Sequence, residues 1–253
     1  MILESFQLTG KIALVTGSSR GLGAEIAVGF AEAGADVVLV ARKGLEETAK
    51  RIEALGRKAL MIQADLSKPE EAVPFVIDQT INHFGRIDIL LNGAGIIRRE
   101  SAVEFSDENW NDVLDVNLKA PFMLSRGVAQ IMRGQGNGKI INLASLLSFQ
   151  GGYLVTSYAV SKAGIAGLTK AQSNEFASYG IQVNAIAPGY MATELTEALQ
   201  KDEIRGRDIL ARIPAGRWGT GKDLQGAAVF LASKASDYVN GHILTVDGGW
   251  MNR

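Results

Sequence analysis

Short apolar runs alternate with longer stretches of helical pattern along the whole chain. The runs are rich in Val, Ile and Leu and lack a regular polar–apolar alternation, which is typical of strands buried on both faces of a parallel sheet. The predicted strands are residues 11–15, 36–40, 59–63, 87–91, 138–143, 181–187 and 243–246. The predicted helices run from a glycine-rich turn to Gly34 and then occupy about residues 45–55, 67–84, 106–132, 153–179 and 222–232.

This alternation predicts an α/β fold: a single Rossmann-type doubly wound parallel sheet with helices on both faces. No linker, repeat or low-complexity tract divides the 253 residues, so residues 1–253 are expected to form a single dinucleotide-binding and catalytic domain. A doubly wound sheet binds its ligand beyond the carboxyl ends of its strands. The functional residues are therefore expected in the loops that follow the strands.

The composition argues against several classes of function. The formal net charge is −1, so no basic surplus points to nucleic acid or to an anionic membrane. The chain has no cysteine, and its two histidines, His83 and His242, lack the spacing of metal ligands, so no metal site is expected. It has no signal-like start and no apolar run of membrane-spanning length, so a cytoplasmic location is expected.

A glycine-rich turn separates the first predicted strand from the first predicted helix. It reads Thr16-Gly17-Ser18-Ser19-Arg20-Gly21-Leu22-Gly23. Glycines let a backbone approach a pyrophosphate, and the N-terminus of the following helix offers free N–H groups and the positive end of its dipole. Between a strand and a helix, such a turn predicts a dinucleotide site.

The residues after the second strand indicate which dinucleotide binds. An acid at this place normally binds the ribose hydroxyls of NAD, but the chain has Ala41-Arg42-Lys43. An arginine can pair with the 2′-phosphate of NADP instead, and Arg20 in the glycine turn supplies a second cation. These residues favour NADP(H), although Arg42 and Arg20 could also be solvated surface charges.

Tyr158 and Lys162 stand four residues apart in a predicted helix, and so on one face of it. An ammonium beside a phenol is expected to lower the pKa of Tyr158. A tyrosine tuned in this way can exchange a proton with an alcohol or a carbonyl oxygen. Taken alone, such a pair is more often the polar stripe of an ordinary helix face.

The glycine turn followed much later by Tyr-x-x-x-Lys resembles the short-chain dehydrogenase/reductase family. The resemblance implies an enzyme that transfers a hydride between a nicotinamide cofactor and a CH–OH group. It implies that Asp65 and Leu66 meet the adenine, and that Pro188, Gly189 and Thr193 meet the nicotinamide end. The full set of implied cofactor-binding residues is Gly17, Ser19, Arg20, Gly21, Leu22, Gly23, Arg42, Asp65, Leu66, Asn92, Ala94, Tyr158, Lys162, Pro188, Gly189, Met191 and Thr193.

The same resemblance implies the catalytic residues. Ser145 stands thirteen residues before Tyr158, which is the spacing of the family, and would hydrogen-bond the substrate oxygen. Tyr158 would be the acid in reduction and the base in oxidation, and Lys162 would lower its pKa and hold the nicotinamide ribose. Asn117 would hold a water that links Lys162 to solvent.

One departure from the family pattern follows the fourth strand, where the chain reads Asn92-Gly93-Ala94-Gly95. Gly93 replaces a second asparagine that in the family helps to tie the central sheet. The resemblance therefore does not account for how the central strands are tied in this chain.

Further stretches resemble the members of this family that act on deoxy sugar acids of the 2-deoxy-D-gluconate or 2-keto-3-deoxygluconate type. They are residues 1–11, 96–100, 147–152, 187–193 and 212–218. This group mostly uses NAD(H), so NAD(H) is the alternative cofactor. Arginine binds carboxylates bidentately, so Arg98 is the predicted partner of the substrate carboxylate and Gln150 that of a hydroxyl. Arg98 and Arg99 could instead form surface salt bridges.

Alternative functions remain open. The same chemistry could act on C5 of gluconate or on a β-ketoacyl thioester, although the two arginines argue against a long acyl chain. A dinucleotide sensor without catalysis predicts a missing catalytic residue, whereas Ser145, Tyr158 and Lys162 are all present. The family resemblance implies a homotetramer, and the apolar segments 229–231 and 246–250 could form a dimer face or belong to the core.

Overall fold

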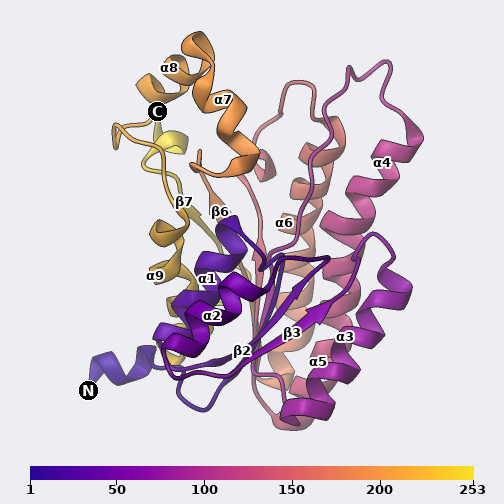
Figure 1. Ribbon diagram of the computed structural model, residues 1–253, viewed down its shortest axis with the longest axis vertical. Coiled ribbons are helices and arrows are strands. Elements are labelled where there is room, and N and C mark those ends of the chain that lie inside the picture. The colour runs from indigo at the N-terminus through magenta and orange to yellow at the C-terminus, as the bar shows by residue number, and fades with distance from the viewer.

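A computed structural model describes residues 1–253, apart from the side chain of Leu195. Seven parallel strands form one sheet in the order β3-β2-β1-β4-β5-β6-β7 (Figure 1). They are β1 Ile12–Thr16, β2 Asp36–Ala41, β3 Ala59–Gln63, β4 Ile89–Asn92, β5 Gly138–Leu143, β6 Ile181–Pro188 and β7 Ile243–Val246. The predicted doubly wound α/β fold is confirmed, with each strand within two residues of its predicted bounds.

The helices cover both faces of this sheet. α1, α2 and α9 pack on one face, while α3, α5 and α6 pack on the other. The helices are α1 Gly21–Glu32, α2 Glu46–Ala54, α3 Pro69–Phe84, α4 Asp107–Leu114, α5 Ala120–Gln135, α6 Thr156–Phe176, α7 Glu197–Lys201, α8 Glu203–Arg212 and α9 Gly221–Ala232.

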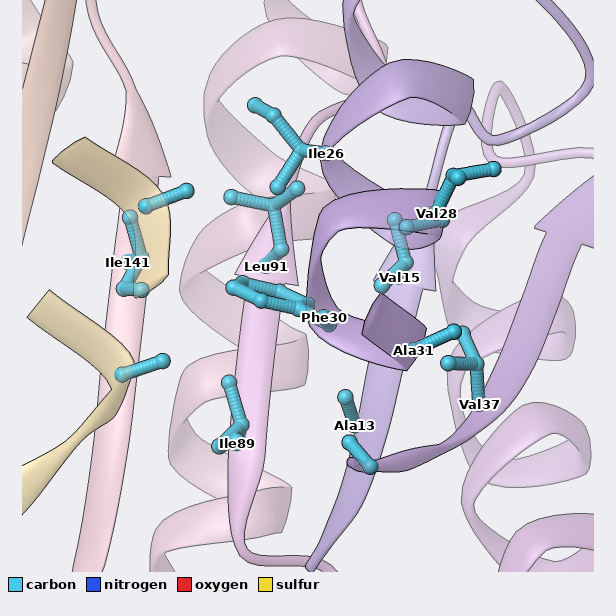
Figure 2. Close-up of a cluster of buried hydrophobic side chains, with 14 of the residues drawn as sticks. Ala13, Val15, Ile26, Val28, Phe30, Ala31, Val37, Ile89, Leu91 and Ile141 are labelled. Carbon is cyan, nitrogen blue, oxygen red and sulfur yellow. The ribbon is translucent and has the colours of Figure 1, made fainter. Parts of the chain in front are cut away.

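The core explains why the strands are apolar at successive positions. Val15 of β1 and Leu91 of β4 point to the face where Ile26 and Phe30 of α1 pack, as Figure 2 shows. Their neighbour Leu14 points to the opposite face and is buried there. Because successive side chains in a strand alternate between faces and both faces are covered, residues 12–15 of β1 are all apolar, and the strand ends on the buried Thr16.

The helix predicted over residues 106–132 is interrupted. Ser106 caps α4, and its Oγ accepts the backbone N–H of Asn109 at 3.3 Å. Between α4 and α5 the chain forms a π-helical segment, Asp115–Lys119, which contains Asn117. Such segments are rare and occur frequently at functional sites. The apolar period of this stretch does not predict the interruption, because the periods of α- and π-helices differ little over one turn.

The short helices α7 and α8 are absent from the sequence-based prediction. They lie between β6 and α9 and are drawn in orange in Figure 1. Among the described side chains, α7 buries none, and in α8 only Gly206 is buried. Without an apolar stripe, neither helix produces the periodic signal on which such a prediction depends. No helix in the described part of the chain has both the length and the hydrophobicity to span a bilayer.

The strand order locates the site. The chain proceeds outward from β1 through β2 to β3 and then returns to pair β4 on the other side of β1. Ligands of doubly wound sheets bind beyond the carboxyl ends of the strands at this reversal. The glycine turn after β1, the loop after β4 and the serine turn after β5 therefore share one edge of the sheet.

Candidate active site

The glycine turn between β1 and α1 packs tightly against the loop after β4. A Cβ atom on Gly17 would lie 2.7 Å from the Cα of Ala94, and a Cβ on Gly23 would collide with the carbonyl oxygen of Gly17. Gly21 differs, because no atom lies within 4 Å of its Cβ position. The turn is thus closed toward the sheet and open at Gly21, which leaves room for a ligand at the start of α1.

The N-terminus of α1 is suited to an anion. Arg20 occupies the N-cap position but its side chain makes no capping hydrogen bond, and the first turn contains no acid. The first N–H groups of a helix have no partner within the helix, and they carry the positive end of its dipole. These donors, beside the open face at Gly21, fit the pyrophosphate of a nicotinamide dinucleotide.

Arg42 and Asp65 follow β2 and β3 and influence one another. Burial tends to raise the pKa of Asp65, but hydrogen bonds from Ser67 and the nearby charge of Arg42 bring this pKa below its usual value. The backbone N–H and the hydroxyl of Ser67 donate to Asp65 Oδ1 at 3.1 and 2.9 Å. Arg42 itself is exposed at this edge, where a phosphate could reach it.

Arg20 lies in the glycine turn and has an acidic partner within the chain, while its predicted contact with the cofactor stays a prediction. Its guanidinium forms an ion pair with Glu194, a residue of the segment that leads from β6 to α7. Both side chains are largely exposed, so the ion pair contributes little to stability. It nevertheless places the start of α7 beside the glycine turn. Glu194 belongs to no motif of the sequence, and only the fold brings it to Arg20.

Tyr158 and Lys162 lie one turn apart on α6, and both are shifted by burial. Lys162 is 5% exposed, and burial lowers its pKa to about 8. Burial also raises the pKa of Tyr158, which a hydrogen bond with the Ser145 hydroxyl offsets only in part. The prediction that the pKa of Tyr158 is lowered is therefore wrong. The ammonium of Lys162 donates to the carbonyl oxygen of Leu143 at 2.6 Å and lies 5.6 Å from the centroid of the Tyr158 ring.

Ser145 follows β5, and the fold brings its hydroxyl to Tyr158. Its Oγ accepts the backbone N–H of Leu147 at 3.2 Å. Ser148 Oγ accepts the backbone N–H of Ser145 at 3.3 Å and donates to the carbonyl oxygen of Lys162 at 2.7 Å. Ser148 thus fixes the serine turn to α6. The spacing to Tyr158 does not predict this role, but the Ser-x-x-Ser pattern, which resembles a helix-capping box, could have indicated it.

Asn117, in the π-helical segment, holds the loop after β4. Its Oδ1 accepts the N–H of Ile96 at 2.8 Å, while its Nδ2 donates to the Ile96 carbonyl oxygen at 2.9 Å and to Ser161 Oγ at 3.1 Å. A Cβ on Gly95 would lie 3.9 Å from Lys162 Nζ. The side chain of Asn117 therefore joins this loop to α6 beside Lys162. Its predicted role in holding a water stays a prediction.

A buried chain of side chains ties the central strands without a second asparagine. Asn92 Nδ2, in β4, donates to Ser125 Oγ of α5 at 3.0 Å and to Asn142 Oδ1 of β5 at 2.8 Å. Asn142 Nδ2 donates in turn to Thr169 Oγ1 of α6 at 2.9 Å. The tie missing from the family motif is thus supplied by Asn142, a residue that the motif does not include.

Arg98 and Gln150, the predicted substrate residues, lie in the loops that flank the site. Arg98 Nε donates to Asn109 Oδ1 at 3.1 Å, and its Nη2 donates to Asp112 Oδ2 at 3.1 Å, so part of the guanidinium is bound to α4. Its remaining N–H donors are available to a carboxylate. Arg99, the next residue, is exposed, and Gln150 is half-buried just after the serine turn.

The end of β6 carries the remaining predicted cofactor residues. The N–H of Gly189 donates to the carbonyl oxygen of Val246 at 2.9 Å, and a Cβ on Gly189 would lie 2.6 Å from the Cα of Asp247. This contact with the end of β7 requires glycine. Met191 is buried, and Thr193 directly precedes Glu194, the partner of Arg20. Thr193 therefore lies in the segment that reaches the glycine turn.

Comparison with known proteins agrees with this geometry. Residues 17–251 match the family model described as Enoyl-(Acyl carrier protein) reductase. The chain is 53% identical over 254 residues to 2-dehydro-3-deoxy-D-gluconate 5-dehydrogenase of Escherichia coli (strain K12), and the match covers 100% of both chains. The chain belongs to the short-chain dehydrogenase/reductase family. As a member of this family, the protein is an oxidoreductase.

Solved structures show how closely this short-chain dehydrogenase/reductase follows its relatives. A protein from Agrobacterium tumefaciens, assigned as a 2-deoxy-d-gluconate 3-dehydrogenase and solved with bound NADP, superposes with a TM-score of 0.93 at 52% identity, over 98% of this chain and 99% of that one. A gluconate 5-dehydrogenase from Burkholderia cenocepacia J2315, in complex with NADP and tartrate, superposes with a TM-score of 0.94 at 42% identity, over 100% of both chains.

Proposed function

We propose that the protein transfers a hydride between NADP(H) and a keto or hydroxy group of a deoxy sugar acid of the 2-deoxy-D-gluconate or 2-keto-3-deoxygluconate type. The observation that carries the proposal is the position of the Ser145 hydroxyl, which lies close enough to the Tyr158 phenol to lower its pKa, beside the buried Lys162. Reduction of a carbonyl needs a donor that holds its oxygen and an acid that protonates it. Ser145 and Tyr158 supply these two groups.

The proton chemistry follows from the two hydroxyls. When bound, the nicotinamide supplies the hydride in reduction and accepts it in oxidation. In reduction, the Ser145 Oγ–H holds the substrate oxygen while the Tyr158 Oη–H gives its proton to that oxygen. In oxidation, Tyr158 Oη takes the proton of the substrate hydroxyl. Because the pKa of Tyr158 is raised, its phenol is protonated at neutral pH and ready to act as the acid.

Lys162 keeps a positive charge near this proton donor. With a pKa of about 8, its amine is mostly charged at neutral pH. We propose that the amine of Lys162 binds the nicotinamide ribose. The 2.6 Å hydrogen bond from this amine to the carbonyl oxygen of Leu143 orients it. Asn117 fixes the loop after β4 beside this amine.

The cofactor would lie along the carboxyl edge of the sheet. The open start of α1 at Gly21 would hold the pyrophosphate, Asp65 and Leu66 the adenine, and the end of β6 the nicotinamide. Arg42, exposed after β2, would pair with the 2′-phosphate. Two of the relatives described above were solved with NADP, which supports NADP(H) over NAD(H).

The substrate assignment rests on the relatives and on the loop after β4. The enzyme of Escherichia coli with 53% identity is named for a deoxy sugar acid, and the relative from Burkholderia cenocepacia was solved with tartrate, a hydroxy acid. Arg98, with N–H donors to spare, and the exposed Arg99 would bind the carboxylate, and Gln150 a hydroxyl. C5 of gluconate is the second candidate, favoured by the name of the same relative.

A turnover panel tests this proposal. Purified protein is assayed with 2-keto-3-deoxygluconate, 5-ketogluconate and acetoacetyl thioester, each with NADPH and with NADH. The proposal expects the highest kcat/KM with the deoxy sugar acid and NADPH, and loss of this activity by at least about a hundredfold in Tyr158→Phe, which cannot donate the proton. Activity on the thioester alone would exclude a sugar-acid enzyme.

The assembly is also part of the proposal. We infer a homotetramer of chains that each form a single domain, and light scattering on the purified protein gives the mass that tests it. Of the two C-terminal segments, Leu231 and Trp250 are buried within the chain, so those side chains belong to its own core rather than to a dimer face. A cytoplasmic location stays a prediction.

A further inference from the structure

The helices α7 and α8 form a cap with almost no core of its own. Among the described side chains, α7 buries none and α8 buries only Gly206. A segment with so few buried contacts has low local stability and depends on its attachments. One attachment is the exposed ion pair of Glu194 with Arg20, at the glycine turn. The other is the C-terminal turn of the chain, residues 247–253, which meets the end of α8.

The C-terminal turn is bound to α8 by one arginine and to the segment just after α8 by one backbone hydrogen bond. The N–H of Ala215 donates to the carbonyl oxygen of Gly248 at 3.0 Å, and Arg253 Nη1 donates to the carbonyl oxygen of Ala211 at 3.1 Å. Figure 1 shows the C-terminus lying next to α8. The turn therefore fixes the place where the cap rejoins the rest of the molecule.

Trp250 is the centre of this attachment. It is 4% exposed and packs in one cluster with Leu146 and Ile213. Its ring lies 4.5 Å from the Tyr190 ring, between centroids, and the guanidinium carbon of Arg212 lies 4.1 Å from its centroid. Tyr190 follows the end of β6, and Arg212 ends α8. The indole therefore contacts the end of β6 and the cap, and it shares a buried cluster with Leu146 of the serine turn.

We propose that Trp250 is a positioning residue that sets the cap against the serine turn and thereby controls the binding of the sugar acid. Leu146 is the residue after Ser145, so a shift of the indole is passed to the group assigned to the substrate oxygen. The proposal rests in this respect on the proposed function. The contacts proposed for the pyrophosphate, at the glycine turn, lie at the other attachment, whereas the indole reaches only the nicotinamide end of the cofactor site, through Tyr190.

The ring rather than its N–H carries this role. Trp250 Nε1 is buried and has no hydrogen-bond partner among the described residues. The indole is therefore held by packing and by the cation–π contact with Arg212. A phenyl ring at the same place can preserve much of both interactions, whereas a methyl group preserves neither.

The test compares Trp250→Ala with Trp250→Phe. Trp250→Ala is expected to raise KM for 2-keto-3-deoxygluconate by about tenfold or more, because small displacements of a binding group are costly. The NADPH dissociation constant is expected to rise by clearly less, because most of the proposed cofactor contacts lie away from the indole. Trp250→Phe is expected to restore KM to within about threefold of the wild type. An unchanged KM, an equal loss of NADPH binding, or no recovery in Trp250→Phe would overturn the proposal.

A surface variant covers the case in which Trp250→Ala does not fold. Arg212→Ala removes only the exposed cation and is expected to raise the same KM by about threefold. Arg207→Ala, an exposed arginine on the same helix, is the matched control and is expected to leave KM unchanged. Equal effects of these two variants, or no effect of Arg212→Ala, would contradict a role for the Trp250 cluster.

Hydrogen exchange separates failure of this inference from failure of the proposed function. In Trp250→Phe and Arg212→Ala, amide exchange without substrate is compared across α8, the serine turn at residues 145–148, and α5 as an internal reference. Faster exchange in α8 and the serine turn, with α5 unchanged, is expected for Arg212→Ala even if the wild type turns over no sugar acid. Unchanged exchange in both segments would refute the positioning role independently of activity.

Discussion

At the scale of single residues, burial shifts the pKa values of the two central groups in opposite directions. Burial favours the neutral form of each, so it raises the pKa of Tyr158 and lowers that of Lys162 to about 8. The phenol therefore stays protonated at neutral pH and has a proton to donate, although the raised pKa makes it a weaker acid than a free tyrosine. Ser145 opposes part of this shift through its hydrogen bond, so it both holds the substrate oxygen in the proposed mechanism and tunes the acid.

The depressed pKa of Lys162 predicts a pH-dependent stability. Between about pH 8 and pH 10.5 the folded chain has lost the Lys162 proton while the unfolded chain keeps it, so stability due to this residue rises with pH. Lys162→Met removes the titration. Between pH 7 and pH 9.5, we expect the free energy of unfolding of the wild type to rise by about 2 kcal/mol relative to that of the variant.

Urea unfolding at the two pH values measures this gain. Lys170→Met, at an exposed position two turns further along α6, serves as the control and is expected to show no such change relative to the wild type. A constant difference between wild type and Lys162→Met across the two pH values would show that the amine is not held in a low-dielectric site.

Arg42 carries the prediction for cofactor choice. Arg42→Ala removes the proposed partner of the 2′-phosphate and is expected to raise KM for NADPH by more than about tenfold, or about 1.4 kcal/mol, with little change for NADH. Steady-state kinetics of the wild type and the variant with NADPH and with NADH measure both KM values. The control is Arg57→Ala, an arginine at the amino edge of β3 whose Nη1 donates to the carbonyl oxygen of Gly34 at 3.0 Å. A wild-type preference for NADH would contradict the assignment.

At the scale of elements, the close approach of two loops explains why the chain has glycine at position 93, where the family motif has asparagine. The N–H of Gly93 donates to Thr16 Oγ1 at 3.0 Å, and a Cβ atom would lie 2.6 Å from the carbonyl oxygen of Thr16. The loop after β4 thus rests directly on the end of β1. The central tie runs through Asn92 and Asn142 instead, so the sheet keeps its cross-link without a side chain at position 93.

Gly93→Ala is therefore expected to destabilise the protein by about 1–3 kcal/mol, because the added methyl group meets backbone that cannot move away without disturbing β1. The matched control is Gly134→Ala in α5, where nothing lies within 4 Å of the Cβ position and alanine should stabilise the helix slightly. Denaturant unfolding of both variants and the wild type measures these changes in the free energy of unfolding. A Gly93→Ala protein as stable as the wild type would mean that the two loops are not in close contact.

The same elements show what a sequence can and cannot predict here. Strands buried on both faces produce apolar runs, so β1 to β7 were predictable, as was the edge of the sheet that carries the site. Helices α7 and α8 lack an apolar stripe and were missed. Contacts such as Arg20 with Glu194 or Asn92 with Asn142 join residues far apart in the chain, and no local pattern encodes them. The upward shift of the Tyr158 pKa depends on burial, which spacing along a helix does not reveal.

At the scale of the whole molecule, the proposed cofactor site draws on both halves of the sheet. Arg42 and Asp65 follow β2 and β3 on one side of β1, while Lys162 and Thr193 come from α6 and the segment after β6 on the other side. A dinucleotide bound along this edge would contact both halves. Binding to the folded chain alone then stabilises the entire cooperative unit rather than one loop.

This predicts a thermal shift that distinguishes the two cofactors. At about one hundred times its dissociation constant a ligand stabilises the folded state by about 2.7 kcal/mol, which for a chain of this size corresponds to a rise in Tm of about 5–10 °C. At equal concentrations, NADPH is expected to raise Tm more than NADH, because only NADPH offers the 2′-phosphate to Arg42. Arg42→Ala is expected to reduce the rise in Tm with NADPH to that with NADH, while the rise with NADH stays the same. Equal shifts in the wild type would mean that Arg42 does not bind the 2′-phosphate and would contradict the preference for NADP(H).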